Sequence, residues 1–496
     1  MGSYITFPEL LIWLPMLAGI LCFISKREQS AKSIALIFSL VILGISAVSL
    51  FYTDSTYATW NAVNYFYPNN IGNSFYVGLD ATGRLLTFLT ALAFPVIFIA
   101  TYKNNYKNAV SFYGLMLLTQ SGLMGVFCAM DALLFYFFWE LALIPVYFLC
   151  SKWGGEKRIQ ATFKFFVYTF TGSLLMLIGI IYVYLHTPGR AFDENTNSMH
   201  SFALNSFMNA SLNATEQNWL FWLFFVAFAV KMPVFPFHTW QPDTYDQSPT
   251  SVTMVLSGIM VKMGLFGVIR WLIPVFPLAS LKFSHIIIIL SVIGIIYASF
   301  IAIVQDNLKK LVAYSSIAHI GLMCAAIFAM NQLSVQGVML QMFNHGINII
   351  GLWIVLDLLE KQTGVKHISK LSGIAHKAPV LTILLVIIAL ANIALPLTNA
   401  FTGEFLMFSG LYKFNVWYAA IAGIGVILAA IYTLNMIQKV FYGNTNSVTD
   451  IVKDISLNEK FILGFIVCLI FVIGIYPQPI IDLTKGAVTV LLNKIK

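Results

Sequence analysis

The chain contains 496 residues, of which 59% are hydrophobic and only 10% are charged. Soluble domains average about 45–50% apolar and about 25% charged residues, so this composition excludes a water-soluble globule of this size. The formal charge of +8 resembles a nucleic-acid-binding signal, but membrane proteins also accumulate Lys and Arg in their cytoplasmic loops. We therefore predict a polytopic membrane protein and use its basic residues to predict orientation.

Hydropathy predicts an all-α fold with about fourteen transmembrane helices, because about 20 mostly apolar residues cross a bilayer as a helix. Two of the spans contain prolines that break or kink a helix: the seventh runs into Pro233 and Pro236, and the twelfth is interrupted at Pro396. The predicted spans are 5–24, 31–51, 78–101, 109–129, 132–150, 159–185, 218–235, 251–271, 284–304, 309–330, 337–358, 379–412, 416–438 and 459–477.

The basic residues predict which loops face the inside of the cell. Of 28 Lys and Arg residues, 17 fall in one set of alternate loops, and 6 fall in the opposite set with both termini: Arg190, Lys282, Lys413, Lys485, Lys494 and Lys496. Because inside loops carry the positive excess, both termini are predicted to lie outside. Segment 236–250 is assigned to the inside but lacks Lys and Arg, and it carries His238, Asp243 and Asp246. We expect this segment to do more than connect two helices.

Five basic residues remain within or at the edges of the spans: Arg84, Lys164, Lys231, Lys262 and Arg270. Lys164 and Arg270 lie near helix ends, where long side chains reach the membrane interface. Arg84 is expected to pair with Asp80, four residues earlier on the same helix face. Lys231 and Lys262 have neither explanation, because both lie near the middle of their spans.

Two acidic residues match these lysines. Glu140 lies in Phe-Phe-Trp-Glu-Leu, and Glu404 lies in Phe-Thr-Gly-Glu-Phe within the broken twelfth span. A charge at the bilayer centre costs about 2.5–3.5 kcal/mol, so such residues pair with one another or line a wet cavity. The four together favour an ion path over helix-to-helix pairing for rigidity.

Two histidines extend this polar set. His319 ends the motif Tyr-Ser-Ser-Ile-Ala-His, and His345 lies in Gln-Met-Phe-Asn-His-Gly-Ile-Asn, residues 341–348. The polar residues of the second motif recur at i, i+3, i+4 and i+7, which places them in one stripe of one helix. Because histidine titrates near neutral pH, the stripe favours a hydrated proton pathway over a hydrogen-bonded core.

The two broken spans predict an inverted repeat. Discontinuous helices in corresponding positions of two halves are typical of such transporters. Pro233 and Pro396 lie 163 residues and five spans apart, and an odd offset requires opposite orientations. The predicted division is 1–105 for helices 1–3, 106–275 for the first repeat with helices 4–8, 280–443 for the second repeat with helices 9–13, and 444–496 for helix 14 and a tail.

In combination, these motifs resemble the antiporter-like membrane subunits of respiratory complex I, the NADH:quinone oxidoreductase. The twelfth-span residue of that family is typically Lys in the L and N types and in multisubunit Na⁺/H⁺ antiporters, but Glu in the M type (chain 4), so Glu404 indicates the M type. Leu397 departs from the family, which more often has Gly after this proline. The matching motifs are Phe-Trp-Glu140, Lys231-Met-Pro233, Lys262, Ser-Ser-Ile-Ala-His319 and Gly-Glu404-Phe.

The resemblance implies a proton-translocating subunit that couples electron transfer in its partners to proton pumping. It implies that Glu140 and Lys231 form an acid–base pair, that Lys262 is the central relay and that Glu404 is the terminal proton site. The implied pathway residues are His319, His345, Ser315, Ser316 and Asn344. The implied location is a bacterial inner membrane, among the other membrane and peripheral subunits and next to the L and N types, with membrane lipid and without nucleic acid.

No redox chemistry is expected on this chain. Its five cysteines include no C-x-x-C pair, and no G-x-G-x-x-G follows a strand pattern. We therefore expect no cofactor and no metal here, and we expect NADH, FMN, iron–sulfur clusters and quinone in partner subunits. Two competing functions stay open: a Na⁺/H⁺ antiporter subunit, and an M-like subunit of a membrane-bound hydrogenase or plastid NDH complex.

Overall fold

The computed structural model describes residues 5–52, 61–66, 72–188 and 200–495. Arg190 and Lys496, which contribute to the loop-charge pattern, lie outside the described residues. The multi-pass helical fold is confirmed, because twelve helices in the described part are long and apolar enough to cross a membrane. They are α1 (Phe7–Ile24), α2 (Glu28–Ser49), α4 (Ala81–Ala100), α5 (Ala109–Cys128), α6 (Ala132–Trp153), α7 (Arg158–Leu185), the stretch Thr250–Val275, α14 (Pro277–Val304), α15 (Leu308–Phe328), α16 (Gln332–Thr363), α20 (Val416–Phe441) and α21 (Leu457–Ile475).

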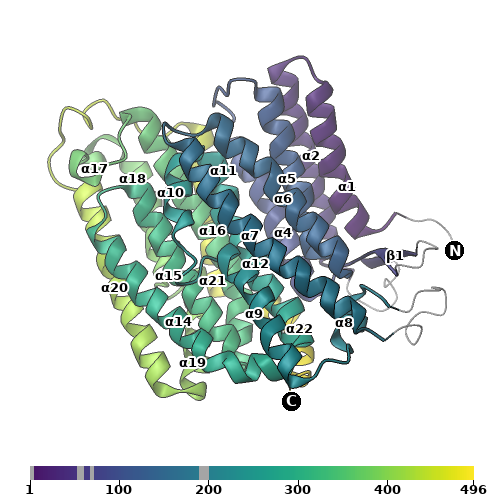
Figure 1. Cartoon of the computed structure of the whole chain (residues 1–496). Helices are drawn as coiled ribbons and strands as arrows, with labels where there is room; N and C mark the ends of the chain where they lie inside the picture. Colours follow the sequence, from purple (N-terminus) through teal and green to yellow (C-terminus); the bar gives the residue numbers. More distant parts are fainter. Residues whose placement is uncertain (1–4, 53–60, 67–71, 189–199, 496) are drawn as a thin grey trace.

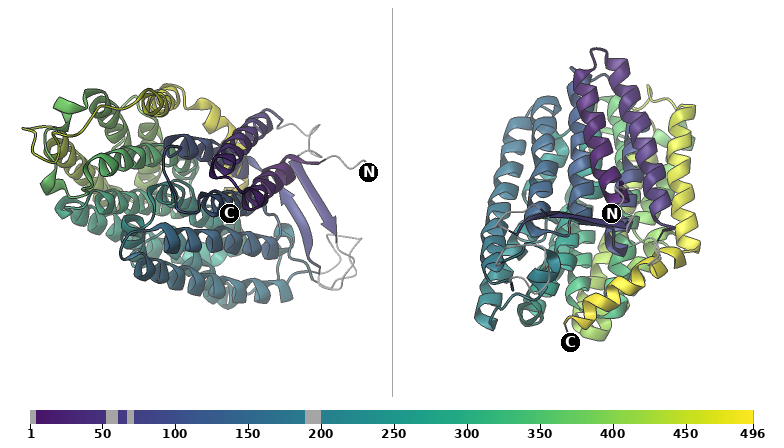
Figure 2. Two further views of the ribbon diagram at one scale, coloured as in Figure 1. Left: turned by 90° about the horizontal axis from the view of Figure 1, so that it is seen from above. Right: turned by 90° about the vertical axis from the view of Figure 1, so that its right-hand side faces the viewer.

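The helices form a bundle that is elongated when seen from above (Figure 2). Helices α1 and α2 stand at one end, and α14 and α20 stand at the other (Figure 1). The central helices carry the polar residues: the most apolar windows of α16 and of Thr250–Val275 are completely buried, whereas that of α2 is 33% buried. Polar groups are thereby kept away from lipid, where an unpaired group costs several kcal/mol, about 2–7 by transfer scales.

The two remaining predicted spans are the ones that were predicted to be broken at prolines, and there the structure has separate helices instead of one continuous span. Helix α9 (Ala214–Lys231) ends before Pro233 and is followed by α10 (Trp240–Gln247). Helix α18 (Pro379–Asn392) is separated from α19 (Asn399–Phe414) by a turn that contains Pro396. In this turn Leu397 has a φ of +72°, a left-handed conformation that glycine adopts at little cost. The count of fourteen crossings and the inverted repeat stay predictions.

The span Thr250–Val275 is not a regular α-helix. Its α-helical pieces α11 (Thr250–Val255), α12 (Val261–Gly267) and α13 (Ile273–Val275) are separated by π-helical turns at Leu256–Met260 and Val268–Leu272. Such turns insert a residue into the helical repeat and occur frequently at functional sites. Lys262 follows the first turn, so the irregular backbone lies directly beside a predicted site residue.

Several elements outside the predicted spans were not foreseen from the sequence. Strands β1 (Ala62–Phe66) and β2 (Ser74–Gly78) form an antiparallel pair in which Ala62 lies opposite Gly78. The predicted C-terminal tail contains α22 (Gln478–Asn493), which crosses the lower side of the bundle obliquely (Figure 2). Gln336 of α16 fixes it by donating to the Ile481 carbonyl at 2.9 Å and the Thr484 hydroxyl at 2.7 Å. Short helices α8 (Leu204–Met208) and α17 (Ile374–Lys377) lie in loops.

Helices α16 and α19 approach closely at two glycines. A Cβ added to Gly337 would lie 2.7 Å from the Gly403 carbonyl oxygen, and a Cβ added to Gly403 would lie 2.7 Å from Gln341 Oε1. Real side chains essentially never approach so closely. Because Gly403 precedes Glu404, the absence of side chains at these positions holds Glu404 against α16.

We expect Gly337→Ala to push α19 away from α16 and to destabilise the protein by about 1–3 kcal/mol, as overpacking of a tight interface does. Thermal unfolding of the purified complex measures the effect. Gly464→Ala is the matched control, because a Cβ at Gly464 meets no atom within 4 Å. Equal unfolding temperatures for the two variants would show that the interface is not tight.

Candidate functional site

Glu140 and Lys231 lie on α6 and α9, which meet where the rings of Trp139 and Phe228 pack 5.7 Å apart. Lys231 Nζ lies over the rings of Trp139 and Phe165, at 5.6 and 5.7 Å from their centroids. Among the described residues, neither Lys231 Nζ nor Glu140 Oε1 has a hydrogen-bond partner. The acid and the base are neighbours that share no hydrogen bond. Cation–π contacts with the two rings offset only part of the free energy that is lost when the Lys231 ammonium is removed from water.

Lys262 is completely buried and contacts α16. Its Nζ donates to the Ser257 carbonyl at 3.0 Å and lies 2.8 Å from His345 Nδ1. Because an ammonium group only donates, His345 Nδ1 accepts and Nε2 carries the ring proton, a tautomer assigned from the contacts. His345 Nε2 then donates to Ser316 Oγ at 3.3 Å. The structure thus joins three of the predicted residues, from three helices.

His319 and Glu404 form a second buried group. His319 Nδ1 lies 3.2 Å from Glu404 Oε1, which also accepts from Gln341 Nε2 at 3.3 Å. Both side chains are only 8% exposed. Because they are shielded from solvent, these contacts stand in for the hydrogen bonds that water would make. The rings of His319 and His345 are 5.7 Å apart. The Lys262 group and the Glu404 group therefore lie side by side, linked through the two histidines.

The polar stripe of α16 divides into two kinds of contact. Gln341 and His345 bind ionisable residues, as described above, whereas Asn344 and Asn348 bind the broken helix. Asn344 Nδ2 donates to the Asn399 carbonyl at 2.6 Å, and Asn348 and Asn399 exchange two side-chain hydrogen bonds of 3.0 Å each. These amides pair the carbonyl and the side chain of Asn399 at the start of α19, which cannot reach water at this depth.

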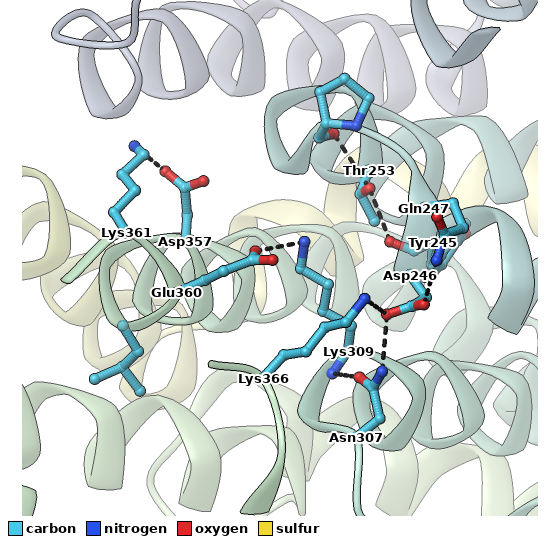
Figure 3. Close-up of polar contacts among 12 residues, drawn as sticks. Tyr245, Asp246, Gln247, Thr253, Asn307, Lys309, Asp357, Glu360, Lys361 and Lys366 are labelled. Atoms are coloured by element: carbon cyan, nitrogen blue, oxygen red, sulfur yellow. Dashed lines mark hydrogen bonds and ion pairs between the residues drawn. The ribbon is translucent and has the colours of Figure 1, made fainter. Parts of the chain in front are cut away.

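The acidic segment 236–250 forms an ion cluster around α10. Asp246 accepts from Lys366 at 2.6 Å, from Asn307 at 2.8 Å and from Gln247 at 2.7 Å (Figure 3). Burial raises the pKa of Asp246, but its hydrogen bonds to Lys366 and Asn307 outweigh burial and lower that pKa below its usual value. Nearby, Lys309 pairs with Glu360 at 2.6 Å.

A cavity of about 680 Å³ adjoins this cluster. Asp243, on its wall, accepts from Lys164 at 2.9 Å and from Lys310 at 3.2 Å. Three lysines from other segments thus bind the two acids of α10. Segment 236–250 supplies the acidic partners of Lys164, Lys310 and Lys366. This role accounts for its lack of Lys and Arg, although inside loops usually carry an excess of basic residues.

One expected ion pair is wrong. Asp80 caps the start of α4 and pairs with Arg270, not with Arg84. Arg84 instead donates to the Tyr52 carbonyl at 3.2 Å. Arg270 also donates to the carbonyls of Phe127 and Ala129 at the end of α5, at 3.3 and 3.4 Å, and is 5% exposed. Its partner Asp80 has a 41% exposed side chain, so Arg270 lies at the level of helix ends, as expected. Sequence spacing favoured the local pair, whereas packing brings a distant partner to Asp80.

Two residues near the site were missed by the sequence analysis. Asn392 Nδ2 lies 3.4 Å from His319 Nε2 and 3.3 Å from Ser315 Oγ, and Tyr432 donates to Ser315 Oγ at 2.9 Å. Asn392 is a lone amide in a strongly apolar run, which is itself a signal that hydropathy averaging conceals. Tyr432 carries no such signal, because tyrosine is common in membrane helices.

The ionisable and hydroxyl groups of the site can carry protons. In the described part of the chain, no cluster of three or more His, Cys, Asp or Glu side chains could hold a metal ion. The buried groups are ammonium, imidazole, carboxyl and hydroxyl, which gain and lose protons in place. Such groups at hydrogen-bond distances can pass protons between neighbours.

Comparison with known proteins supports this geometry. Residues 129–431 match the family model described as NADH:quinone oxidoreductase/Mrp antiporter, TM. The NADH-quinone oxidoreductase subunit M of Rickettsia typhi is 35% identical over 97% of this chain and 98% of its own. The chain belongs to the NADH:quinone oxidoreductase/Mrp antiporter family. Subunit M of Escherichia coli K12, another member, is 32% identical over 96% of both chains.

Solved structures agree with this family membership. A chain of respiratory complex I from Thermus thermophilus with bound NADH has a TM-score of 0.87 at 27% identity, covering 97% of this chain and 99% of that chain. A chain of the Mrp complex from Dietzia sp. DQ12-45-1b has a TM-score of 0.86 at 17% identity, covering 98% of each, and shows the same fold.

Replacing Asn399 tests the amide network at the helix break. We expect Asn399→Leu to leave the amide of Asn348 unpaired and to destabilise the protein by about 1–3 kcal/mol. The double variant Asn348→Leu/Asn399→Leu should recover part of this loss, because both polar partners are then removed together. Thermal unfolding of the two variants and of Asn348→Leu completes the cycle; additive effects would contradict a direct interaction.

Replacing Asp246 tests the ion cluster through pH. A lowered pKa means that its carboxylate stabilises the fold above the unfolded pKa of about 3.9, and this stabilisation is lost as pH falls through the folded pKa. We expect Asp246→Asn to lower the unfolding temperature at pH 7 and to have little effect below about pH 3. Glu156→Gln, at the same cavity but without an ion pair among the described contacts, is the control and should change neither.

Proposed function

We propose that this chain is the M-type membrane subunit of a proton-translocating NADH:quinone oxidoreductase. Family membership and the similarity to M subunits support the assignment. The observation that carries the mechanism is the buried line of proton-carrying groups at 2.8–3.3 Å, from Lys262 through His345 and Ser316 to the neighbouring pair of His319 and Glu404. The Na⁺/H⁺ antiporter and the hydrogenase-type or plastid-type subunit are the competing assignments.

Proton uptake is assigned to Glu140 and Lys231. The cavity of about 680 Å³ is lined by Ala161 and Lys164 of α7, and the adjacent Phe165 lies against Lys231. The cavity thus approaches Lys231 from the loops that the basic residues assign to the inside. When Glu140 moves toward Lys231, its carboxylate favours the ammonium form, and when it moves away, the buried lysine releases its proton more easily.

Transfer through the centre is assigned to Lys262 and its histidine. Lys262 gives a proton to His345 Nδ1 along the 2.8 Å contact while Nε2–H is donated toward Ser316. One N–H bond forms on the ring and one breaks, so the imidazole passes a proton without retaining an extra charge. Ser316 takes this proton and releases its own hydroxyl proton, which passes through water to His319 Nε2 once the Asn392 amide leaves that nitrogen. His319 then releases its Nδ1 proton to Glu404, the terminal site. Asn344 and the breaks at Pro233 and Pro396 hold this line in place.

Energy for the transfer comes from partner subunits, which carry out the electron transfer. The proposed pathway uses no redox group of this chain. The partners are the other subunits of the complex, with the L and N types as neighbours along the membrane. The orientation follows the loop charges, with both termini on the periplasmic side.

Lys231→Ala and Glu140→Ala test the uptake step. In membranes containing the assembled complex, we expect NADH-driven proton pumping, measured by quenching of a pH-sensitive dye, to fall about tenfold or more, since each variant removes a charge interaction of at least about 1.4 kcal/mol. Lys282→Ala is the control, because Lys282 is exposed at the start of α14. Full pumping in Lys231→Ala would contradict the proposed pathway.

The competing assignments require separate measurements. A Na⁺/H⁺ antiporter subunit would support Na⁺ flux driven by a pH gradient in membranes without NADH, whereas we expect no such flux above background. Purification of the chain with its neighbours separates the proposed complex from a hydrogenase-type or plastid-type complex, because only the proposed complex oxidises NADH with quinone as acceptor.

A further inference from the structure

A second cavity on the inside face leads toward the terminal site. It has a volume of about 220 Å³ and is lined by residues of the loops and helix ends assigned to the inside, including Asp306, Ser369 and Lys439. Its wall on α20 is formed by Tyr432, Asn435, Met436 and Lys439, which lie on one stripe of that helix. The cavity therefore extends about two helical turns into the bundle and ends at Tyr432.

Tyr432 also lines a small cavity on the other side, next to His319 and Glu404. This cavity has a volume of about 20 Å³, which is room for about one water. Tyr432 is 1% exposed and is common to both linings, so its side chain separates the inside-face cavity from the Glu404 cavity. A phenol at such a position keeps bulk water out and can still pass a proton through its hydroxyl.

The hydroxyl of Tyr432 begins a hydrogen-bonded line to Glu404. It donates to Ser315 Oγ at 2.9 Å, and Asn392 Nδ2 bridges Ser315 Oγ at 3.3 Å and His319 Nε2 at 3.4 Å. His319 Nδ1 then contacts Glu404 at 3.2 Å. Because Asn392 Nδ2 only donates, His319 Nε2 accepts and Nδ1 carries the proton that is shared with Glu404, a tautomer assigned from the contacts.

Before they meet at His319, this line and the Lys262 line use different residues. Ser316 contacts His345 on the Lys262 line, whereas Ser315, one residue earlier on α15, accepts from Tyr432. The two lines meet only at His319, whose ring lies 5.7 Å from that of His345. Glu404 is thus approached from two directions, one along the membrane plane and one from the inside face.

We propose that Tyr432, Ser315 and Asn392 form a second proton entrance, which connects the inside-face cavity directly to His319 and Glu404; the inference rests on the proposed proton-translocating function. Asn392 closes the entrance while its amide occupies His319 Nε2. When the amide withdraws, Tyr432 accepts a proton from cavity water and gives its own to Ser315. Ser315 gives its proton to His319 Nε2, and His319 releases the Nδ1 proton to Glu404. Tyr432, Ser315 and His319 each gain and lose one proton, so the net change is one proton lost by the cavity water and one gained by the Glu404 carboxylate.

Tyr432→Phe tests the hydroxyl, because the ring is kept and only the proton-carrying group is removed. The entrance is expected to reload Glu404 in every cycle and therefore to act in series with the Lys231 step. In the assembled complex, we expect the initial rate of NADH-driven pumping to fall about fivefold, the rate equivalent of one lost hydrogen bond. The loss should increase as the pH on the inside face is raised, because proton supply through the entrance then becomes limiting. Tyr418→Phe is the matched control: it lies on the same helix, and its hydroxyl contacts His285, away from both cavities.

Asn435→Cys tests access from the inside face. In inside-out vesicles, we expect a membrane-impermeant, positively charged thiol reagent to slow pumping in Asn435→Cys. Lys453→Cys, exposed in a loop on the same face, should react without loss of pumping. Unchanged pumping and an unchanged pH profile in Tyr432→Phe, or equal pumping of labelled and unlabelled Asn435→Cys, would overturn the second entrance.

The two proposals fail in different ways. If Lys231→Ala abolishes pumping while Tyr432→Phe does not reduce it, the second entrance is wrong and the proposed function stands. If Lys231→Ala leaves pumping intact, the proposed function itself is wrong, whatever the result for Tyr432→Phe.

Discussion

The cost of a charge in hydrocarbon determines the arrangement of the whole protein. Lys262, Glu404 and Arg270 are each buried, and each has at least two hydrogen-bond or ion-pair partners. Within the described part of the chain, Lys231 is different, because it contacts aromatic rings and no hydrogen-bond acceptor. A buried ammonium with so little compensation changes its proton affinity most when a carboxylate approaches. Lys231, the buried charge with the fewest polar partners, therefore lies where a change of protonation state is useful.

Broken helices bring a related cost, because their open ends cannot be solvated at membrane depth. At the break before α19, Asn344 of α16 donates to the Asn399 carbonyl and Asn348 pairs with the Asn399 side chain, while Gln341 and His345, from the same stripe, contact the ionisable groups. Helix α16 thus holds the start of α19 and also contacts the Glu404 carboxylate of that helix. A shift of α19 would alter the Glu404 contacts and the amide bonds at the same time, which couples the proton site to the fold.

The sequence predicts the parts of this protein that follow from hydropathy and from costly residues. Long apolar runs predict the spans, and prolines within two of them predict the broken helices. Charged residues in apolar runs mark the half-buried Glu140 and the buried Lys231, Lys262 and Glu404, because a charge in lipid is costly. Partner choice does not follow such a rule: Asp80 binds Arg270 rather than Arg84 because helix packing, not spacing, brings them together. Tyr432 was missed for the same reason, since its role depends on two cavities that only the folded chain forms.

Helix α15 connects the charged and the neutral parts of the site. Near its inside end Lys310 binds Asp243 at the first cavity, and further along Ser315 contacts Tyr432, Ser316 contacts His345, and His319 contacts Glu404. The Lys310 pair is half-exposed and ionic, so it responds to nearby charge and is screened by salt. The three inner contacts are buried and directional, so they respond to displacement of a few tenths of an ångström. A rigid movement of α15 would therefore convert a change of charge at the inside face into a change of proton contacts about 8–14 Å deeper, given a rise of about 1.5 Å per helical residue.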